Sequence, residues 1–468
     1  MDFSQLIFWR ILFFSILLMQ VVGVVLKCIH PAMSCSLTQK RHKLFLLVIS
    51  WVMLGVVSME TLTIFLFVCI VAYVACSFQT RYHLISAHLL LGVLIPVLLM
   101  PLFYYKYADF AVNDILGNEY DFIRNLVIPV GISFYSFQVV AFCIDSLINK
   151  EPMPHFMDYM LFCSFFPQIV AGPIERKKDL LPQMENIDSR FNVENLRIGI
   201  CYMLTGIYFK SVLADNLASY MVTHYDGESA VVIWVNNLLF SLRIYFDFAG
   251  YGLTAWGLAR CFNIRLTMNF WSPYTATNIS EFWRRWHISL TSWFRDYIYF
   301  PLKGSRTKWW WLNILIVFLI SGVWHGAGWN FIIWGLLIGV TMLMHRVFSK
   351  RGYSMPPFMG WLLTIFTMVY IWMFFYVTEP AALWQHIRNV ADVSHYYGSF
   401  PLPGNKSDAA LGILIALSAL TVALEFISLK KYKEPYRIFT HPAMLIIMIT
   451  LLFIGRAGEA PEFIYFAF

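Results

Sequence analysis

Apolar residues along this chain gather in long runs that short polar or charged segments interrupt. The runs lack the strict alternation of polar and apolar positions that is typical of strands, and a backbone in lipid must satisfy its own hydrogen bonds. The pattern therefore predicts an all-α, polytopic bundle of transmembrane helices with about 11–12 crossings. The runs lie near 11–26, 44–59, 61–77, 84–104, 126–148, 158–174, 199–222, 232–263, 309–344, 357–378, 410–428 and 442–455.

The composition of the 468-residue chain supports this prediction. Charged residues make up 13%, against roughly 25% in a typical soluble domain, and hydrophobic residues make up 59%. Soluble globules, nucleic-acid-binding proteins and secreted disulfide scaffolds are therefore excluded as leading interpretations. The eight cysteines form no C-x-x-C pair, so no metal site is predicted. Because the interruptions are short, we predict one integral membrane domain over 1–468, with N-terminal helices over 1–125, a catalytic core over 126–345 and C-terminal helices over 346–468.

The formal net charge of +7 indicates basic loops kept in the cytoplasm rather than an acidic partner. All basic clusters fall on one side only if the run 158–174, which contains Pro167, Gly172 and Pro173, enters the membrane and returns. We therefore predict a re-entrant segment there, with the N-terminus outside; the alternative is a miscounted run upstream. The clusters lie at 27–43, 176–178, 265–308, 346–351 and 430–437.

The run 309–344 contains no Lys, Arg, Asp or Glu and is too long to be one straight helix. Its residues would extend about 54 Å, whereas the hydrocarbon core of a bilayer is about 30 Å thick. The glycines at 322, 326 and 328 predict a break around Trp324 and His325, within the membrane or just short of its outer face.

His325 at this break is a candidate catalytic residue. A polar ring inside a bilayer is costly unless it faces protein or water, and imidazole can take a proton from an attacking hydroxyl near neutral pH. The structural alternative is a histidine that donates a hydrogen bond to a backbone carbonyl, which the helix break leaves without its helical partner.

The block 280–304 combines aromatic and basic residues around His287. Ser280 and the helical spacing predict a capped, amphipathic helix on the cytoplasmic surface. Its aromatic and basic residues, including Trp283 and Trp286, are typical of membrane-interface anchors. Alternatively, Arg284 and Arg285 grip a pyrophosphate and, with Trp283 and Trp286, form a cradle that binds a phosphate-bearing donor.

Asp247 lies in the middle of an apolar run, among aromatic residues. An intramembrane carboxylate is a functional candidate by default. It is equally consistent with a structural acceptor buried against Tyr245 or Tyr251.

Five stretches, in this order along the chain, resemble the membrane-bound O-acyltransferase (MBOAT) family, in the branch that contains bacterial alginate and peptidoglycan O-acetyltransferases. The block around His287 followed by Trp324-His325-Gly326 is the most specific of them. The resemblance implies a multi-helix fold with re-entrant elements and a central tunnel open to both faces. The stretches are GISFYSFQ (131–138), FFPQIVAGPI (165–174), YFDFAGYG (245–252), SEFWRRWHISLTSWFRDYIYFPLKG (280–304) and SGVWHGAGWNFIIWG (321–335).

The resemblance also implies a function. An acyl group, usually acetyl, moves from a cytoplasmic thioester such as acetyl-CoA to a hydroxyl of an extracytoplasmic polysaccharide or to a partner transferase. His325 matches the family's intramembrane catalytic histidine, and His287 matches its second histidine on the donor side. We expect no tightly bound cofactor, a periplasmic SGNH-type partner transferase and a bacterial inner-membrane location. Together with the residues above, Trp324, Asn330 and Asp247 are expected to line the tunnel.

Three questions stay open at this point. His325 acts either as a general base or as a transient acyl carrier. The acyl group is acetyl or another, such as D-alanyl transferred to teichoic acid. A transporter of a small solute or lipid, which also uses broken helices, is the alternative from another class.

Overall fold

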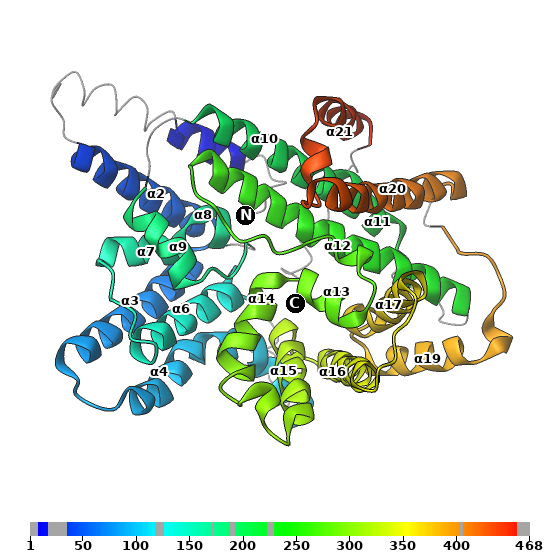
Figure 1. Cartoon of the computed structure of the whole chain (residues 1–468), viewed down its shortest axis with the longest axis horizontal. Coiled ribbons are helices and arrows are strands. Elements are labelled where there is room, and N and C mark those ends of the chain that lie inside the picture. Colours follow the sequence, from blue (N-terminus) through cyan, green and yellow to red (C-terminus); the bar gives the residue numbers. More distant parts are fainter. Residues whose placement is uncertain are drawn as a thin grey trace. The chain divides into compact units, whose positions relative to one another are not determined.

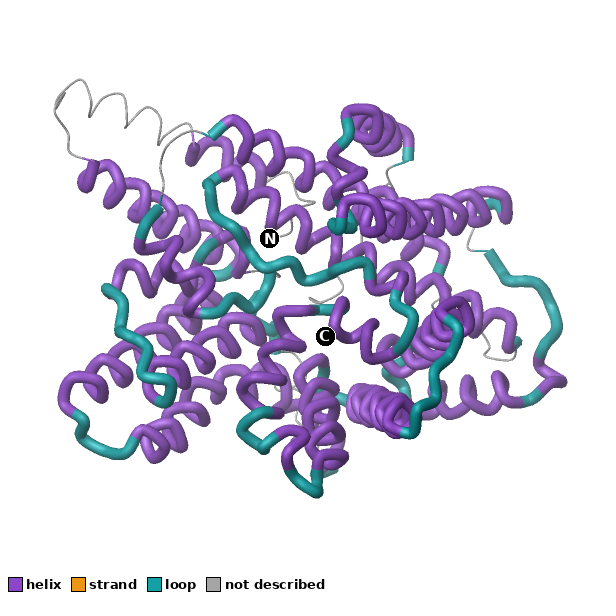
Figure 2. The backbone as a smooth tube through the Cα atoms, viewed as in Figure 1, coloured by secondary structure: helices purple, strands orange, loops and turns teal. Residues whose placement is uncertain are grey.

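The computed structural model describes residues 8–16, 35–117, 126–169, 172–187, 192–221, 229–402 and 406–455. Every regular element within these ranges is a helix, as Figures 1 and 2 show. The prediction of an all-α fold is therefore confirmed. The chain forms two compact units: unit 1 comprises 1–203 and 255–267, and unit 2 comprises 204–254 and 268–468.

Unit 1 is built around α3, which packs against α2, α4 and α6. The described residues of the segment predicted to be re-entrant hold two short helices, of 9 and 4 residues, with a kink at Phe165. At 1.5 Å per residue the longer one extends about 14 Å, which is too short to cross a membrane. The elements are α2 (Cys35–Val57), α3 (Met59–Tyr82), α4 (Ala87–Leu102), the π-helices η1 (Phe103–Tyr107) and η2 (Phe110–Ile115), α6 (Ile132–Leu147), α7 (Phe156–Ser164), α8 (Phe166–Ile169) and α9 (Lys177–Glu185). The orientation of the N-terminus stays a prediction.

Unit 2 holds all of the candidate site residues. Two long helices, α10 (Val193–Ile207) and α12 (Ala230–Cys261), contribute residues to both units. The other elements are η3 (Tyr208–Ala214), α11 (Asp215–Tyr220), η4 (Pro273–Thr275), α13 (Ile279–Arg285), α14 (Ile288–Phe294), η5 (Arg295–Tyr299), η6 (Gly304–Arg306), α15 (Trp310–His325), α16 (Trp329–Lys350), α17 (Pro357–Ile371), α18 (Met373–Tyr376), α19 (Pro380–Ala391), η7 (Val393–His395), α20 (Asp408–Tyr432), η8 (Arg437–Thr440) and α21 (Pro442–Ile454).

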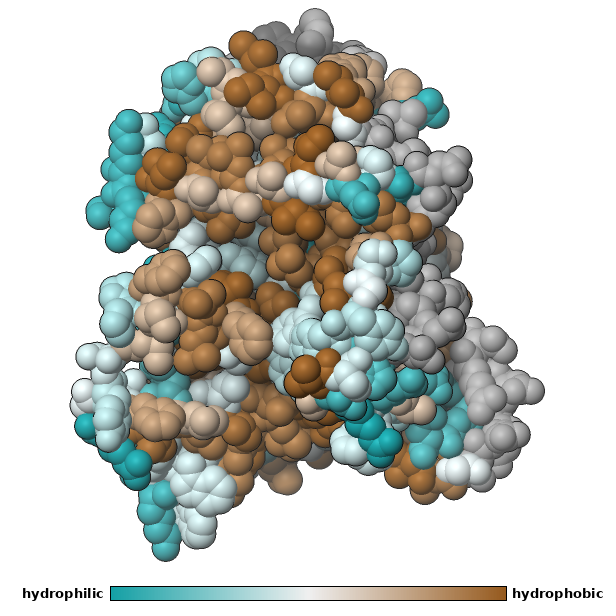
Figure 3. Space-filling view, turned by 90° about the vertical axis from the view of Figure 1, so that its right-hand side faces the viewer, coloured by the Kyte–Doolittle hydropathy of each residue, from teal (hydrophilic) through white to brown (hydrophobic). Residues whose placement is uncertain are grey.

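Seven helical segments of the described chain are long and apolar enough to cross a membrane: 59–82, 87–107, 193–220, 230–261, 329–350, 357–376 and 408–432. Three further apolar helices, α6, α15 and α21, are shorter. Large apolar side chains such as Leu362, Phe366 and Leu420 are exposed on α17 and α20, and hydrophobic surface covers much of the face in Figure 3. An exposed apolar surface of this kind suits lipid rather than water. The sequence-based estimate of about 11–12 crossings also included the run 158–174 and the run near 11–26, which lies largely outside the described residues.

The predicted break in the run 309–344 is confirmed. Helix α15 ends at His325, α16 begins at Trp329, and Gly326 and Gly328 between them have extended backbones. The two helices then pack closely at Gly322 and Gly335, whose Cα atoms leave no room for side chains. This close crossing fixes the position of the α15 end that carries His325.

We expect Gly335→Ala to disturb this crossing. The added Cβ would overlap the carbonyl oxygen of Phe318 and lie 3.2 Å from the Gly322 Cα. Overpacking against backbone costs about 1–3 kcal/mol, which exceeds the gain in helix propensity of about 1 kcal/mol. Thermal unfolding in detergent should show a lowered midpoint. Gly412→Ala in α20, where no atom lies within 4 Å of the new Cβ, is the matched control and should not lower it; equal behaviour of the two variants would contradict the packing argument.

Candidate functional site

The block 280–304 does not form the single amphipathic surface helix that its sequence predicts. It forms two short helices, α13 and α14, which are separated at Trp286 and His287. The cap is Asn278 rather than Ser280, because the Asn278 side chain accepts a hydrogen bond from the Glu281 backbone N–H at 2.9 Å. Trp286 and His287 are 1% and 2% exposed, so the junction lies in the interior of the protein.

His287 adopts a left-handed backbone conformation, with φ 43° and ψ 56°. Residues other than glycine rarely adopt it, and it costs on the order of 1–3 kcal/mol unless the surroundings impose it. The segment before α13 imposes this conformation here. The Ile288 N–H donates to the Asn269 carbonyl, and the Trp271 N–H donates to the Arg285 carbonyl, both at 2.9 Å. The backbone is thus held on both sides of His287.

The two candidate histidines contact the same indole ring. The centroid of Trp324 lies 6.0 Å from that of His287 and 4.8 Å from that of His325, and both ring pairs are edge-on. His325 also packs against Trp334 and Phe375, with centroids 5.0 and 5.3 Å away. Although the histidines are 38 positions apart in sequence, the fold brings them into one aromatic cluster.

Burial also fixes the charge of His287. Its removal from water lowers the pKa of the imidazole to about 3, and the adjacent ring of Phe248, 4.7 Å away, is apolar. The ring is therefore neutral near physiological pH. A neutral imidazole can accept a proton or donate a hydrogen bond from one nitrogen, but it offers no positive charge to a phosphate.

The remaining predicted aromatic and polar residues surround this cluster. The centroid of Trp283 lies 5.9 Å from that of Trp334, and Trp286 reaches the same group through Trp372 at 5.0 Å. Asn330, near the start of α16, donates to the carbonyl of Phe374 at 3.2 Å. The tunnel that these residues are expected to line stays a prediction.

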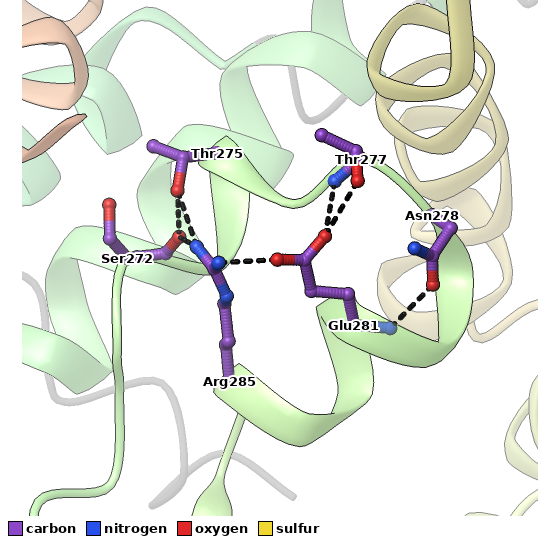
Figure 4. A network of polar contacts seen from close by, with 6 residues as sticks. All are labelled: Ser272, Thr275, Thr277, Asn278, Glu281 and Arg285. Carbon is purple, nitrogen blue, oxygen red and sulfur yellow. Dashed lines mark hydrogen bonds and ion pairs between the residues drawn. The ribbon is translucent and has the colours of Figure 1, made fainter. Parts of the chain in front are cut away.

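Arg285 takes part in an internal network, which Figure 4 shows. Its guanidinium pairs with Glu281 and donates to the Thr275 hydroxyl at 2.7 Å. Burial raises the pKa of Glu281, but hydrogen bonds from Thr277 and the charge of Arg285 outweigh burial and lower it overall. The network holds the start of α13 against the loop that precedes it.

Arg284 is exposed, whereas its neighbour Arg285 is held by these internal contacts. Adjacent residues of a helix do not share a face. Of the two arginines, Arg284 is thus the one exposed to solvent, and the grip of a pyrophosphate by both arginines stays a prediction.

Asp247 is paired with a lysine that the sequence reading missed. Its carboxylate lies 2.9 Å from the Lys210 ammonium, which also lies 2.7 Å from the Asp215 carboxylate. All three side chains are buried. Tyr245, one of the two predicted partners of Asp247, instead donates to Glu425. The sequence did contain a signal for this ion cluster, because a Lys and an Asp lie within the apolar run 199–222. Charged residues inside a membrane are rare and usually form ion pairs or have a function.

The chain matches the membrane-bound O-acyltransferase (MBOAT) family over residues 2–383. It belongs to this family. It is 36% identical over 324 residues to the peptidoglycan O-acetyltransferase of Helicobacter pylori, and this match covers 61% of each chain. The probable alginate O-acetylase AlgI of Pseudomonas aeruginosa is 30% identical over 74% of this chain and 68% of its own length. The teichoic acid D-alanyltransferase of Bacillus subtilis is 28% identical over 80% of this chain and 98% of its own length.

The family assignment confirms the resemblance drawn from the motifs, and it identifies a multi-pass membrane protein of an acyltransferase family. The chain matches less than two thirds of the length of the Helicobacter pylori protein. The roles of His287, His325 and the residues around them stay predictions. Helix α20 lies beyond residue 383, where the family match ends.

The buried state of His287 predicts an acid-sensitive stability. Since the folded-state pKa is below the value of about 6.5 expected in the unfolded chain, the unfolded chain alone binds a proton as the pH falls below 6.5. The free energy of unfolding of the wild type should then fall by about 1.4 kcal/mol for each pH unit relative to that of His287→Asn. Asparagine is the chosen replacement because it tolerates the left-handed backbone and does not titrate. Thermal unfolding in detergent between pH 6.5 and 4.5 measures this slope. His88→Asn, at an exposed position, should follow the wild type; parallel slopes for wild type and His287→Asn would show that His287 titrates normally.

Removal of the Lys210 charge should strongly destabilise the protein. Lys210→Met leaves two buried carboxylates without the ammonium that pairs with them, which typically costs about 3–5 kcal/mol. Arg197→Met is the control, because Arg197 pairs with Glu194 at the exposed surface, where an ion pair contributes about 0–1 kcal/mol. The yield of monodisperse protein and its unfolding midpoint should separate the two variants clearly. A Lys210→Met protein as stable as Arg197→Met would refute the importance of this ion cluster.

Proposed function

We propose that this chain is an acyltransferase that moves an acetyl group from a cytoplasmic thioester to a hydroxyl of a cell-envelope polysaccharide outside the membrane. The observation that carries the proposal is the pair of buried histidines on Trp324, in a chain of the MBOAT family. The names of two relatives, a peptidoglycan O-acetyltransferase and a probable alginate O-acetylase, support the acetyl group and the polymer acceptor.

His325 is the proposed proton acceptor. As the acceptor hydroxyl attacks the thioester carbonyl, its proton moves to the His325 imidazole, the C–O bond forms and the C–S bond breaks. The imidazolium then returns the proton to the leaving thiolate, so that free thiol and acyl ester are the products. In the alternative route, the imidazole itself receives the acyl group and passes it on. His287 lies on the donor side and, being neutral, orients the thioester by a hydrogen bond rather than by charge.

The donor is a diffusible substrate, acetyl-CoA or a related acyl thioester, and no tightly bound cofactor is proposed. Arg284 is the exposed cation near α13 that suits its phosphates, since guanidinium groups bind phosphate oxygens well. Acceptors of this kind lie outside the cytoplasm, so we place the chain in a bacterial inner membrane. A periplasmic SGNH-type transferase is the proposed partner that completes transfer to the polysaccharide.

D-alanyl transfer to teichoic acid is the second candidate. The match to the Bacillus subtilis teichoic acid D-alanyltransferase covers 98% of that protein and therefore favours it specifically. Isotope-labelled acetyl and D-alanyl thioesters, offered separately to vesicles that contain the protein and the acceptor polymer, distinguish the two functions by which label the polymer receives.

His325→Ala should lower acyl transfer to the acceptor by about 10²-fold or more, because a positioned acid–base group contributes about 10²–10⁴-fold. Transfer is measured with the labelled thioester in vesicles that contain equal amounts of folded protein. His88→Ala, which removes an exposed histidine of α4, should transfer at the wild-type rate. Full activity of His325→Ala at normal folding would rule out this assignment.

A further inference from the structure

Glu425 is a buried carboxylate in the apolar helix α20. It is fully buried, and it lies in a segment long and apolar enough to cross the membrane. It also lies beyond the part of the chain that matches the family, which ends at residue 383. A carboxylate in such a place is costly unless it is hydrogen-bonded.

Hydroxyl groups satisfy this carboxylate. The Tyr245 hydroxyl lies 2.8 and 2.7 Å from its two oxygens, and the Ser272 hydroxyl donates to it at 2.8 Å. Among the described residues, no lysine or arginine forms an ion pair with Glu425. Its bonds therefore fix the positions of two side chains rather than compensate a charge.

One of these side chains belongs to the segment 269–273, which precedes α13 and holds the backbone at His287. Ser272 has a left-handed backbone, with φ 53°, and is fully buried. The hydroxyl of Tyr436, which follows α20, donates to the carbonyl of Phe270 at 3.2 Å. Residues 270 and 272 are thus bonded to the C-terminal part of the chain.

The alternate residues of the segment are bonded to the α13–α14 junction. Asn269 accepts from the Ile288 N–H at 2.9 Å and from the Ser289 hydroxyl at 2.6 Å, and the Trp271 N–H donates to the Arg285 carbonyl. One segment therefore bonds to two elements. It connects α20 and Tyr436 to the backbone on both sides of His287.

We propose that Glu425 is a positioning residue for His287. By holding Ser272 and Tyr245, it fixes the segment 269–273, and this segment fixes the strained backbone that orients the imidazole beside Trp324. Tyr245 adds a second connection, because its ring lies 6.2 Å from that of Trp286, the residue before His287. The catalytic part of the proposal rests on the proposed function, whereas the structural connection does not.

Hydrogen exchange tests the connection without any activity. Glu425→Gln keeps the size of the side chain, but one of the two oxygens that face the Tyr245 hydroxyl becomes an NH2 group, which donates and cannot accept. Exchange at the amides of Trp271 and Ile288 should speed up at least tenfold, while exchange in α15 should not change. Ser418→Ala removes a fully buried hydroxyl of the same helix that bonds only within α20, and it is the matched control. Unchanged exchange at Trp271 and Ile288 in Glu425→Gln would overturn the proposal.

A double-mutant cycle tests the action through His287. Glu425→Gln should lower the turnover number for transfer about tenfold, but less than twofold in a protein that already carries His287→Asn. Equal loss in both backgrounds would mean that Glu425 only stabilises the fold, which contradicts a positioning role. Ser418→Ala should leave turnover unchanged.

A third variant tests the same connection in case Glu425→Gln folds poorly. Tyr436→Phe removes the bond to the Phe270 carbonyl and the contact of the Tyr436 hydroxyl with the Tyr245 hydroxyl at 3.4 Å, but it leaves Glu425 in place. It should speed exchange at Trp271 about threefold; no change would count against the proposal. The experiments distinguish a failure of the proposed function from a failure of the proposed role of Glu425. If His287→Asn transfers at the wild-type rate, the donor-side role of His287 in the proposed function is wrong, and the exchange result alone then decides whether Glu425 holds the segment.

Discussion

This structure depends on one constraint: polar groups inside an apolar protein must form their hydrogen bonds and ion pairs with other groups of the same protein. Lipid offers no hydrogen bonds, and the interior offers few, so each buried charge must have a defined partner. Lys210 lies between two aspartates, and Glu425 receives hydroxyl groups. The buried polar side chains therefore mark the places where separate helices are fixed relative to one another within unit 2.

His287 illustrates how such bonds act on a site. Its left-handed backbone is unfavourable by itself, and it is held by backbone bonds to the segment 269–273 on both sides. The local sequence cannot supply these bonds, because the segment precedes α13 and pairs with the junction only in the folded protein. Strain at this candidate site residue and its tertiary support thus occur together, as is common where a side chain must point in one direction.

The sequence predicted those features that depend on local pattern. The length of the run 309–344 and its glycines predicted the break that ends α15 at His325, because no single straight helix of that length fits a bilayer. The all-α fold followed from the length of the apolar runs. The family stretches indicated both histidines, although the pattern alone did not place them in contact with the same indole.

Features that depend on distant partners were missed. The helical spacing of 280–304 favoured one helix, but bonds from Asn269 and Trp271 interrupt it at His287. Glu425 is fully buried and bonds to Tyr245, which lies 180 positions away, so no local pattern could join them.

The connection from Glu425 to His287 also bears on how the C-terminal helices relate to the family core. The matched region ends before α20, yet α20 and Tyr436 bond to residues 270 and 272, which lie inside that region. Reactions that depend on close approach lose rate when a reacting group is displaced by about 1 Å. A helix outside the shared core can therefore influence chemistry at its centre without touching the substrate, provided that the bonds between them are few, directional and buried. The carboxylate of Glu425, with its bonds to Tyr245 and Ser272, meets each of these conditions.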